Sequence, residues 1–117
     1  MKTILIVEDT ELNIDLLTQL LEDDYNLLVA KDGAQGIQAA EENNPDLILM
    51  DISLPVMDGY EATRRIRTTM HSTPIIGLSA HAMQGDEARA KEAGCTDYLT
   101  KPVDEDLLMS KLKQYLG

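Results

Sequence analysis

Five polar side chains lie at the ends of short apolar runs in the sequence. Glu8 and Asp9 follow the first run, Asp51 follows the third, Ser79 ends the fourth and Lys101 lies just past the fifth. If these runs are parallel strands, their carboxyl ends share one edge of a sheet, so the five side chains should converge. Like charges about 4 Å apart repel by on the order of 4 kcal/mol at an effective dielectric near 20. Three clustered carboxylates therefore require a counter-charge.

A hard divalent cation is the natural counter-charge, because Mg²⁺ binds one or two carboxylates together with water and phosphate oxygens. Lys101 supplies a second cation that can pair with Asp51 when the site is empty and with a phosphoryl oxygen when it is filled. Ser79 can donate a hydrogen bond to that same oxygen. A carboxylate can also attack phosphorus and form an aspartyl phosphate. This set of residues therefore favours phosphoryl transfer.

The segments that carry these residues alternate between continuous apolar runs and amphipathic stretches. Continuous apolar runs are typical of parallel strands that are buried on both faces. The predicted strands are Ile4 to Val7, Leu27 to Ala30, Asp46 to Met50, Pro74 to Ser79 and Asp97 to Thr100. This order predicts an α/β fold, a doubly wound five-stranded parallel sheet with right-handed crossovers and helices on both faces.

Helices are expected between the strands and after the last one. Three of them are predicted over 33 to 43, 59 to 69 and 84 to 94. The first helix is expected to bury one leucine face, formed by Leu12, Leu16, Leu17, Leu20 and Leu21. The last helix is expected to bury the face formed by Val103, Leu107, Leu108, Leu112, Tyr115 and Leu116. Asp58 is predicted to cap the helix that starts at Gly59, and Gly94 to end the helix before it in a left-handed conformation.

Length and charge set further bounds. The chain has 117 residues, which fits one domain over residues 1–117 with one core. Lys and Arg number 10 against 21 Asp and Glu, a net charge of −11, so direct binding to nucleic acid or to a membrane surface is not expected. Cys95 is the single cysteine and cannot form a disulfide within the chain. With no apolar run near the roughly 20 residues of a membrane span, a soluble cytoplasmic protein is expected.

Five sequence motifs occur in order along the chain, namely Ile4-Leu-Ile-Val-Glu-Asp9, Pro45-Asp-Leu-Ile-Leu-Met-Asp51, Leu54-Pro-Val-Met-Asp-Gly59, Leu78-Ser-Ala80 and Asp97-Tyr-Leu-Thr-Lys-Pro102. Taken together, these motifs resemble the receiver (response-regulator) domain of two-component signalling. The resemblance covers essentially the whole chain and, through residues 79 to 86, favours the stand-alone and hybrid-kinase-associated receivers. It implies a flavodoxin-like (βα)5 fold with strand order 2-1-3-4-5.

The resemblance also implies a reaction and a cofactor. Asp51 would be the phosphoacceptor, phosphorylated by a histidine kinase or a histidine phosphotransfer protein. Asp9, Asp51 and the backbone carbonyl of Ser53 would bind Mg²⁺, with Glu8 acting directly or through water. The protein would be a phosphorylation-controlled switch, not an enzyme beyond catalysing its own phosphorylation and dephosphorylation. We expect a monomer or weak dimer.

The resemblance assigns roles to residues around the phosphoacceptor. Lys101 and Ser79 would hold the phosphoryl oxygens, and Tyr98 would turn inward when Ser79 moves toward the phosphate. The changed surface would be the fourth helix, fifth strand and fifth helix, where a downstream protein binds. Ser53 and His81 are expected to tune dephosphorylation because they lie beside the site. The family also favours a cis peptide bond before Pro102.

Three alternatives remain at this stage. The chain could be a phosphorelay shuttle or the receiver module of a hybrid kinase. It could be a Mg²⁺-dependent phosphatase of the haloacid-dehalogenase type, although such enzymes have a second acid two residues after the nucleophile, where this chain has Ser53. It could be a flavodoxin-like binder of flavin phosphate, although the loop Glu8-Asp-Thr-Glu11 is acidic instead of rich in hydroxyl groups and glycine.

Overall fold

The computed structural model describes residues 1–80 and 86–117 of the chain. Strands and helices alternate throughout, as the sequence predicts. The elements are β1 (Thr3–Val7), α1 (Glu11–Leu21), β2 (Asn26–Ala30), α2 (Gly33–Asn43), β3 (Leu47–Asp51), α3 (Gly59–Arg67), β4 (Ile75–Ser79), α4 (Asp86–Ala93), β5 (Asp97–Thr100) and α5 (Glu105–Leu116). The strands form one parallel sheet in the order β2-β1-β3-β4-β5, which confirms the predicted fold and strand order.

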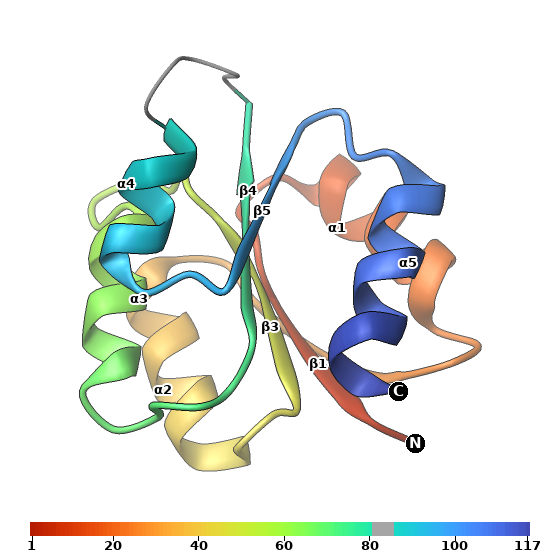
Figure 1. The fold of residues 1–117 in the computed structure, drawn as a ribbon, viewed down its shortest axis with the longest axis horizontal. Coiled ribbons are helices and arrows are strands. Elements are labelled where there is room, and N and C mark those ends of the chain that lie inside the picture. The colour runs from red at the N-terminus through yellow and green to blue at the C-terminus, as the bar shows by residue number, and fades with distance from the viewer. Residues whose placement is uncertain (81–85) are drawn as a thin grey trace.

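Helices cover both faces of the sheet. Helices α1 and α5 lie on one face, and α2, α3 and α4 lie on the other (Figure 1). Each face has its own apolar core instead of the single core expected, because strands β1, β3 and β4 contribute alternate residues to both faces. In β1, for example, Ile4 and Ile6 pack toward one core while Leu5 and Val7 pack toward the other. The three central strands are therefore fixed from both sides.

Most predicted boundaries agree with the observed ones to within one or two residues. The helix over 33–43 has the predicted bounds, while α3 ends at Arg67, before the predicted 69. Strand β3 is shifted by one residue, because the sheet pairing continues to Asp51, which lies beside Leu78 of β4. Asp58 caps α3 by accepting a hydrogen bond from the Glu61 backbone N–H at 3.0 Å. The Lys101–Pro102 bond is cis, as expected.

The predicted buried face of α1 is partly wrong. Leu17 and Leu21 are buried, but Leu12 and Leu16 are 67% and 57% exposed. The buried positions are instead Ile14, Leu17 and Leu21, spaced three and four residues apart. This stripe is narrow because α1 packs onto the sheet along one side, so Leu12 and Leu16 face solvent, while Leu20 is half-buried against the core.

The same correction applies to α5. Leu108 and Leu112 are buried there, as predicted, whereas Leu107 is 47% exposed. The number of leucines in α1 and in α5 therefore overestimates how much of the surface of each helix is covered by the sheet. No helix in the described ranges 1–80 and 86–117 combines the length and apolar character needed to cross a lipid bilayer.

Gly59 brings the start of α3 against the end of β3. A Cβ atom at this position would lie 2.3 Å from the backbone oxygen of Asp51 and 2.7 Å from the Cα atom of Ile52. The Gly59 N–H also donates to the Ile52 carbonyl at 2.9 Å. The absence of a side chain therefore lets the loop after Asp51 close tightly.

We predict that Gly59→Ala lowers the free energy of unfolding by about 1–3 kcal/mol, because the methyl group must displace backbone atoms of β3. Urea unfolding of the full chain measures the change. Glu41→Ala is the control, since Glu41 is exposed on α2, and it should unfold like the wild type. Equal stability of Gly59→Ala and wild type would contradict this account of the loop.

Candidate functional site

Four polar side chains are buried among the described residues, and three of them belong to the predicted site. Glu8, Asp51 and Ser79 are 1%, 2% and 3% exposed, and the fourth is Thr63 in α3. Burying an ionised carboxylate is costly unless it is paired or hydrogen-bonded. Two such carboxylates at one edge of an apolar sheet therefore indicate a functional site.

The sheet itself brings these residues together. Asp51 is the last residue of β3, which lies between β1 and β4. The Glu8 N–H continues the sheet pairing by donating to the Ala30 carbonyl at 2.9 Å, and the Lys101 N–H donates to the Ser79 carbonyl at 2.6 Å. Backbone hydrogen bonds thus fix the Cα positions of the residues that carry the site.

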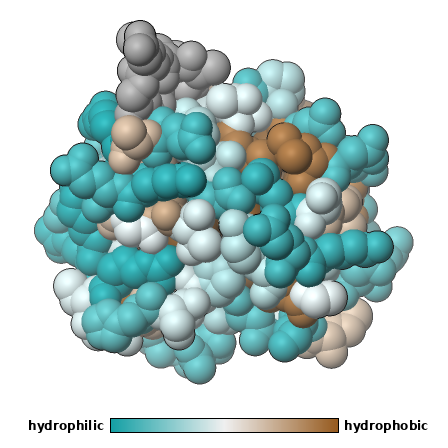
Figure 2. Space-filling view, viewed as in Figure 1, coloured by the Kyte–Doolittle hydropathy of each residue, from teal (hydrophilic) through white to brown (hydrophobic). Residues whose placement is uncertain are grey.

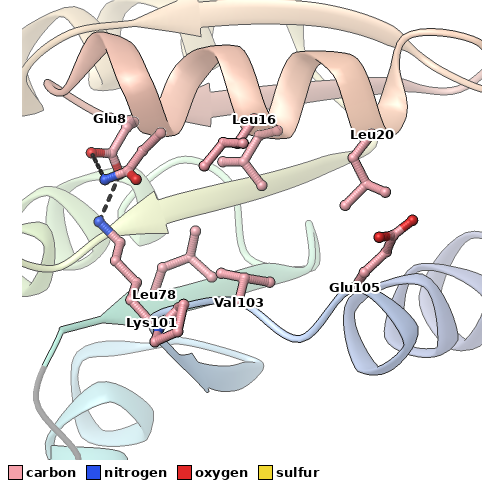
Figure 3. A pocket seen from close by; sticks show the side chains of 10 residues that line it. Glu8, Leu16, Leu20, Leu78, Lys101, Val103 and Glu105 are labelled. Carbon is pink, nitrogen blue, oxygen red and sulfur yellow. Dashed lines mark hydrogen bonds and ion pairs between the residues drawn. The ribbon is translucent and has the colours of Figure 1, made fainter.

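Lys101 joins the two buried acids. Its Nζ lies 2.9 Å from Glu8 Oε2 and 3.2 Å from Asp51 Oδ1, and Figure 3 shows the contact with Glu8. The pair with Asp51 was expected from the sequence, whereas the closer pair with Glu8 was not. The Ser53 backbone N–H also donates to Asp51 Oδ1, at 3.1 Å.

The pKa values of Asp51 and Lys101 are both raised, for different reasons. Burial raises the pKa of the Asp51 carboxyl group, and repulsion by Glu8 raises it further, while the Ser53 N–H and Lys101 only partly offset this. Burial alone would lower the pKa of Lys101, but its hydrogen bond to Glu8 and the charge of Asp51 outweigh burial and raise that pKa. Lys101 therefore stays protonated while it holds both acids.

Three acids at this edge could bind a metal ion. One carboxylate oxygen each from Glu8, Asp9 and Asp51 lies within 4.8 Å of the others. Asp9 is exposed, so water also reaches this cluster. Carboxylates and water are the ligands that Mg²⁺ prefers, so the donor set fits that ion. Ser53, two residues after Asp51, is exposed beside the cluster.

The remaining predicted residues lie in different surroundings. Ser79 ends β4 and is buried beside this edge of the sheet. Tyr98 of β5 is half-buried and packs against the core on the α2, α3 and α4 side. His81 lies outside the described residues.

Asn13 is a site residue that sequence reasoning missed. Its side-chain Nδ2 donates to Glu8 Oε1 at 3.2 Å, and the Thr10 backbone N–H donates to the same oxygen at 3.3 Å. The missed signal was its spacing, because Asn13 lies five residues after Glu8, in the first turn of α1. A helix start that follows a strand directly can return a side chain to the end of that strand.

An apolar pocket adjoins the site. It has a volume of about 230 Å³ and is lined by Glu8 of the acidic cluster and by Lys101. Its other walls come from α1, the end of β4, the segment before α5 and the first residue of α5, namely Asn13, Leu16, Leu17, Leu20, Leu78, Pro102, Val103 and Glu105 (Figure 3). Figure 2 shows a hydrophobic area on an otherwise largely hydrophilic face, at the upper right, where the segment before α5 runs beside α1.

Comparison with known proteins identifies the family. Residues 4–113 match the model of the response regulator receiver domain. The chain is also 39% identical over 119 residues to the polar-differentiation response regulator DivK of Brucella ovis, covering 99% of this chain and 97% of that protein. The chain therefore belongs to the response regulator receiver domain family, the receiver domains of two-component signalling.

Solved structures with the same fold give further context. The chain is 40% identical to the receiver domain of the sensor histidine kinase PA1611 from Pseudomonas aeruginosa, with a TM-score of 0.91 and coverage of 99% and 98% of the two chains. That structure has a magnesium ion coordinated in the active site cleft. The present chain is also 32% identical to the receiver domain of Ssk1 from Saccharomyces cerevisiae, solved in complex with the histidine phosphotransfer protein Ypd1, with a TM-score of 0.90 and coverage of 97% and 88%.

The raised pKa of Asp51 predicts a cost in stability. An acid whose pKa is higher in the folded state destabilises that state when it is ionised. Asp51→Asn should therefore raise the free energy of unfolding at pH 7 by about 1 kcal/mol. The gain should shrink as the pH falls through the raised pKa of Asp51 toward about 3.9, the ordinary value.

Urea unfolding without Mg²⁺ at several pH values checks this prediction. Asp23→Asn serves as the control, because Asp23 is exposed and its charge should matter little. A loss of stability in Asp51→Asn at pH 7 would show that the Lys101 pair outweighs burial and repulsion.

Proposed function

We propose that this chain is a phosphorylation-controlled signalling switch in which Asp51 accepts a phosphoryl group. The observation that carries the proposal is the buried carboxylate of Asp51 beside a second buried acid and a protonated lysine. A carboxylate oxygen of Asp51 attacks phosphorus, the new O–P bond forms, and the P–N bond to the donor's imidazole breaks. The imidazole nitrogen keeps the electron pair of that bond.

The neighbouring residues have separate roles in this proposal. Asp9, Asp51 and the Ser53 backbone carbonyl would hold Mg²⁺, with Glu8 acting directly or through water. When bound, that ion neutralises charge on the acids and on the phosphoryl oxygens. Lys101 leaves the Asp51 carboxylate and pairs with a phosphoryl oxygen.

Ser79 and Tyr98 would transmit the change. Ser79 lies beside Asp51 across the β3–β4 pairing, since Asp51 pairs with Leu78. Its hydroxyl donates to a phosphoryl oxygen, and its movement makes room for the Tyr98 ring to turn inward. Tyr98 already packs against the core under α4, so its movement alters the α4-β5-α5 face on which a downstream protein binds.

Helix α4 is suited to respond, because small side chains anchor it. Ala90 and Ala93 are its buried apolar residues among those described. The Arg89 guanidinium also lies over the Tyr60 ring, 4.6 Å from its centroid. Methyl groups bury little area, so few contacts oppose a shift of this helix.

The phosphodonor would be a histidine kinase or a histidine phosphotransfer protein, as in the Ypd1 complex with the Ssk1 receiver domain. A donor histidine must reach Asp51 at the edge of the sheet, so its protein must cover the adjoining surface. The apolar pocket and the exposed Leu12 and Leu16 offer that protein an apolar contact. This arrangement serves a switch, a relay shuttle or a receiver module equally well.

We propose that this chain has no enzymatic activity beyond its own phosphorylation and dephosphorylation. A phosphatase of the haloacid-dehalogenase type has an acid two residues after its nucleophile, and this position is Ser53 here. We also propose that residues 1–117 form one receiver domain, in line with the family match over 4–113.

Acetyl phosphate with Mg²⁺ should add one phosphoryl group to the wild-type chain, detected by intact mass and labile to base. Asp51→Asn should take up none. Lys101→Ala should react about 100-fold more slowly, the usual effect of removing one group that stabilises developing charge. An undiminished adduct on Asp51→Asn, or none on wild type, would disprove the assignment.

The lifetime of the phosphorylated state tests the two residues beside the site. We predict that Ser53→Ala and His81→Ala each change the rate of dephosphorylation, because in the sequence Ser53 follows Asp51 by two residues and His81 follows Ser79 by two residues. The decay of the mass adduct after removal of acetyl phosphate gives the rate. His71→Ala is the matched control and should decay like wild type; equal rates in all four proteins would remove both residues from this role.

A further inference from the structure

The Glu8 carboxylate is held on both of its oxygens. Lys101 Nζ lies 2.9 Å from Oε2, while the Asn13 amide and the Thr10 N–H donate to Oε1 at 3.2 and 3.3 Å. Glu8 is 1% exposed, so its orientation depends on these protein donors and little on solvent. Of the two side chains that hold it, Lys101 is the one that leaves its present partners in the proposed reaction.

Asn13 is firmly placed for this contact. It lies in the first turn of α1, where the next residue, Ile14, and then Leu17 are buried against the sheet. Asn13 itself is half-buried and lines the pocket beside Glu8 and Lys101. The backbone that carries its amide is therefore fixed relative to β1.

The chemistry of the amide matters as much as its position. A neutral N–H donor orients a carboxylate and leaves its negative charge available to a cation. A lysine or arginine at this position would neutralise that charge instead. A hydrogen bond of this kind, made to a ligand from outside the coordination sphere, restricts the ligand to one orientation before the ion binds.

We propose that Asn13 is a positioning residue that holds the Glu8 carboxylate in the orientation required for Mg²⁺ and for Lys101, and so sets the affinity for Mg²⁺. This inference rests on the proposed function, because it assumes that the acidic cluster binds that ion. Without the amide, Glu8 keeps the Thr10 N–H and Lys101, and it is free to follow Lys101 away from the cluster. Binding of the ion must then order Glu8 as well.

Isothermal titration of the full chain with MgCl₂ tests the proposal without any phosphodonor. Asn13→Leu preserves the size of the side chain and removes the donor, and its dissociation constant for Mg²⁺ should rise about 10-fold, the lower end of such effects. Asn13→Gln keeps the amide on a longer chain and should recover part of the affinity. Asn43→Leu removes an asparagine whose amide donates to Ala39 O on α2, and should match wild type.

A kinetic measurement separates positioning from a general structural role. In the acetyl phosphate reaction, the Mg²⁺ concentration that gives half the maximal rate should rise by the same factor in Asn13→Leu. The maximal rate at saturating Mg²⁺ should change much less, because saturating Mg²⁺ orders Glu8 again. A merely structural role would instead lower the maximal rate as well and leave the Mg²⁺ concentration for half the maximal rate unchanged.

Each outcome has a defined meaning. Unchanged or tighter Mg²⁺ binding in Asn13→Leu, with normal binding and phosphorylation of wild type, overturns the role of Asn13 alone. An equal loss of affinity in Asn43→Leu also overturns it. Wild type that binds no Mg²⁺ and gains no phosphoryl group overturns the proposed function and this inference with it.

Discussion

The arrangement of one ammonium group between two buried carboxylates is the interaction on which the site depends. Lys101 lies within 3.2 Å of oxygens on both Glu8 and Asp51, and both acids are almost fully buried. Burying an ion costs several kcal/mol even after relaxation, and removal of one partner leaves the other uncompensated. Burial and repulsion by Glu8 together outweigh the single cation, so the pKa of Asp51 remains raised. The site is therefore short of positive charge, which favours a divalent cation.

The sheet is held rigidly enough to keep these charged residues close together despite the cost of burying them. Strands β1, β3 and β4 are buried on both faces, and the two cores fix them from opposite sides. The charged residues lie beyond or at the last paired positions of these strands, so they share an edge without interrupting the apolar layers. Backbone pairing up to Asp51 and from Ser79 to Lys101 fixes the distances between them. Rigid placement is what allows acids to be held close despite their repulsion.

The sequence was sufficient to predict the parts that depend on local patterns. Apolar runs indicated all five strands, and the order of strands and helices indicated the fold. It also indicated that Glu8, Asp9, Asp51, Ser79 and Lys101 share one edge. Other features depend on which side of a helix the sheet covers. Leu12 and Leu16 are leucines of α1 like the buried Leu17, yet they face solvent. The contact of Asn13 with Glu8 and the preference of Lys101 for Glu8 depend on side-chain geometry that no spacing rule provides.

The position of Lys101 between two acids also provides a route by which phosphorylation could change the rest of the fold. Before transfer, Lys101 pairs with Glu8, which follows β1, and with Asp51, which ends β3. Since Lys101 itself follows β5, these ion pairs link the ends of three strands. In the proposed reaction the phosphoryl group adds a charge of about −1 to −2 at Asp51, and the strongest acceptors for Lys101 and Ser79 become its oxygens. Glu8 then loses its cation and depends on Asn13 and Thr10 to stay in place. Under this proposal, a displacement of Ser79 in β4 would be passed to β5, whose Thr100 lies beside it in the sheet register. The shortage of positive charge at the edge would then be the source both of the affinity for the cation and of the force that moves the strand ends toward the signalling face.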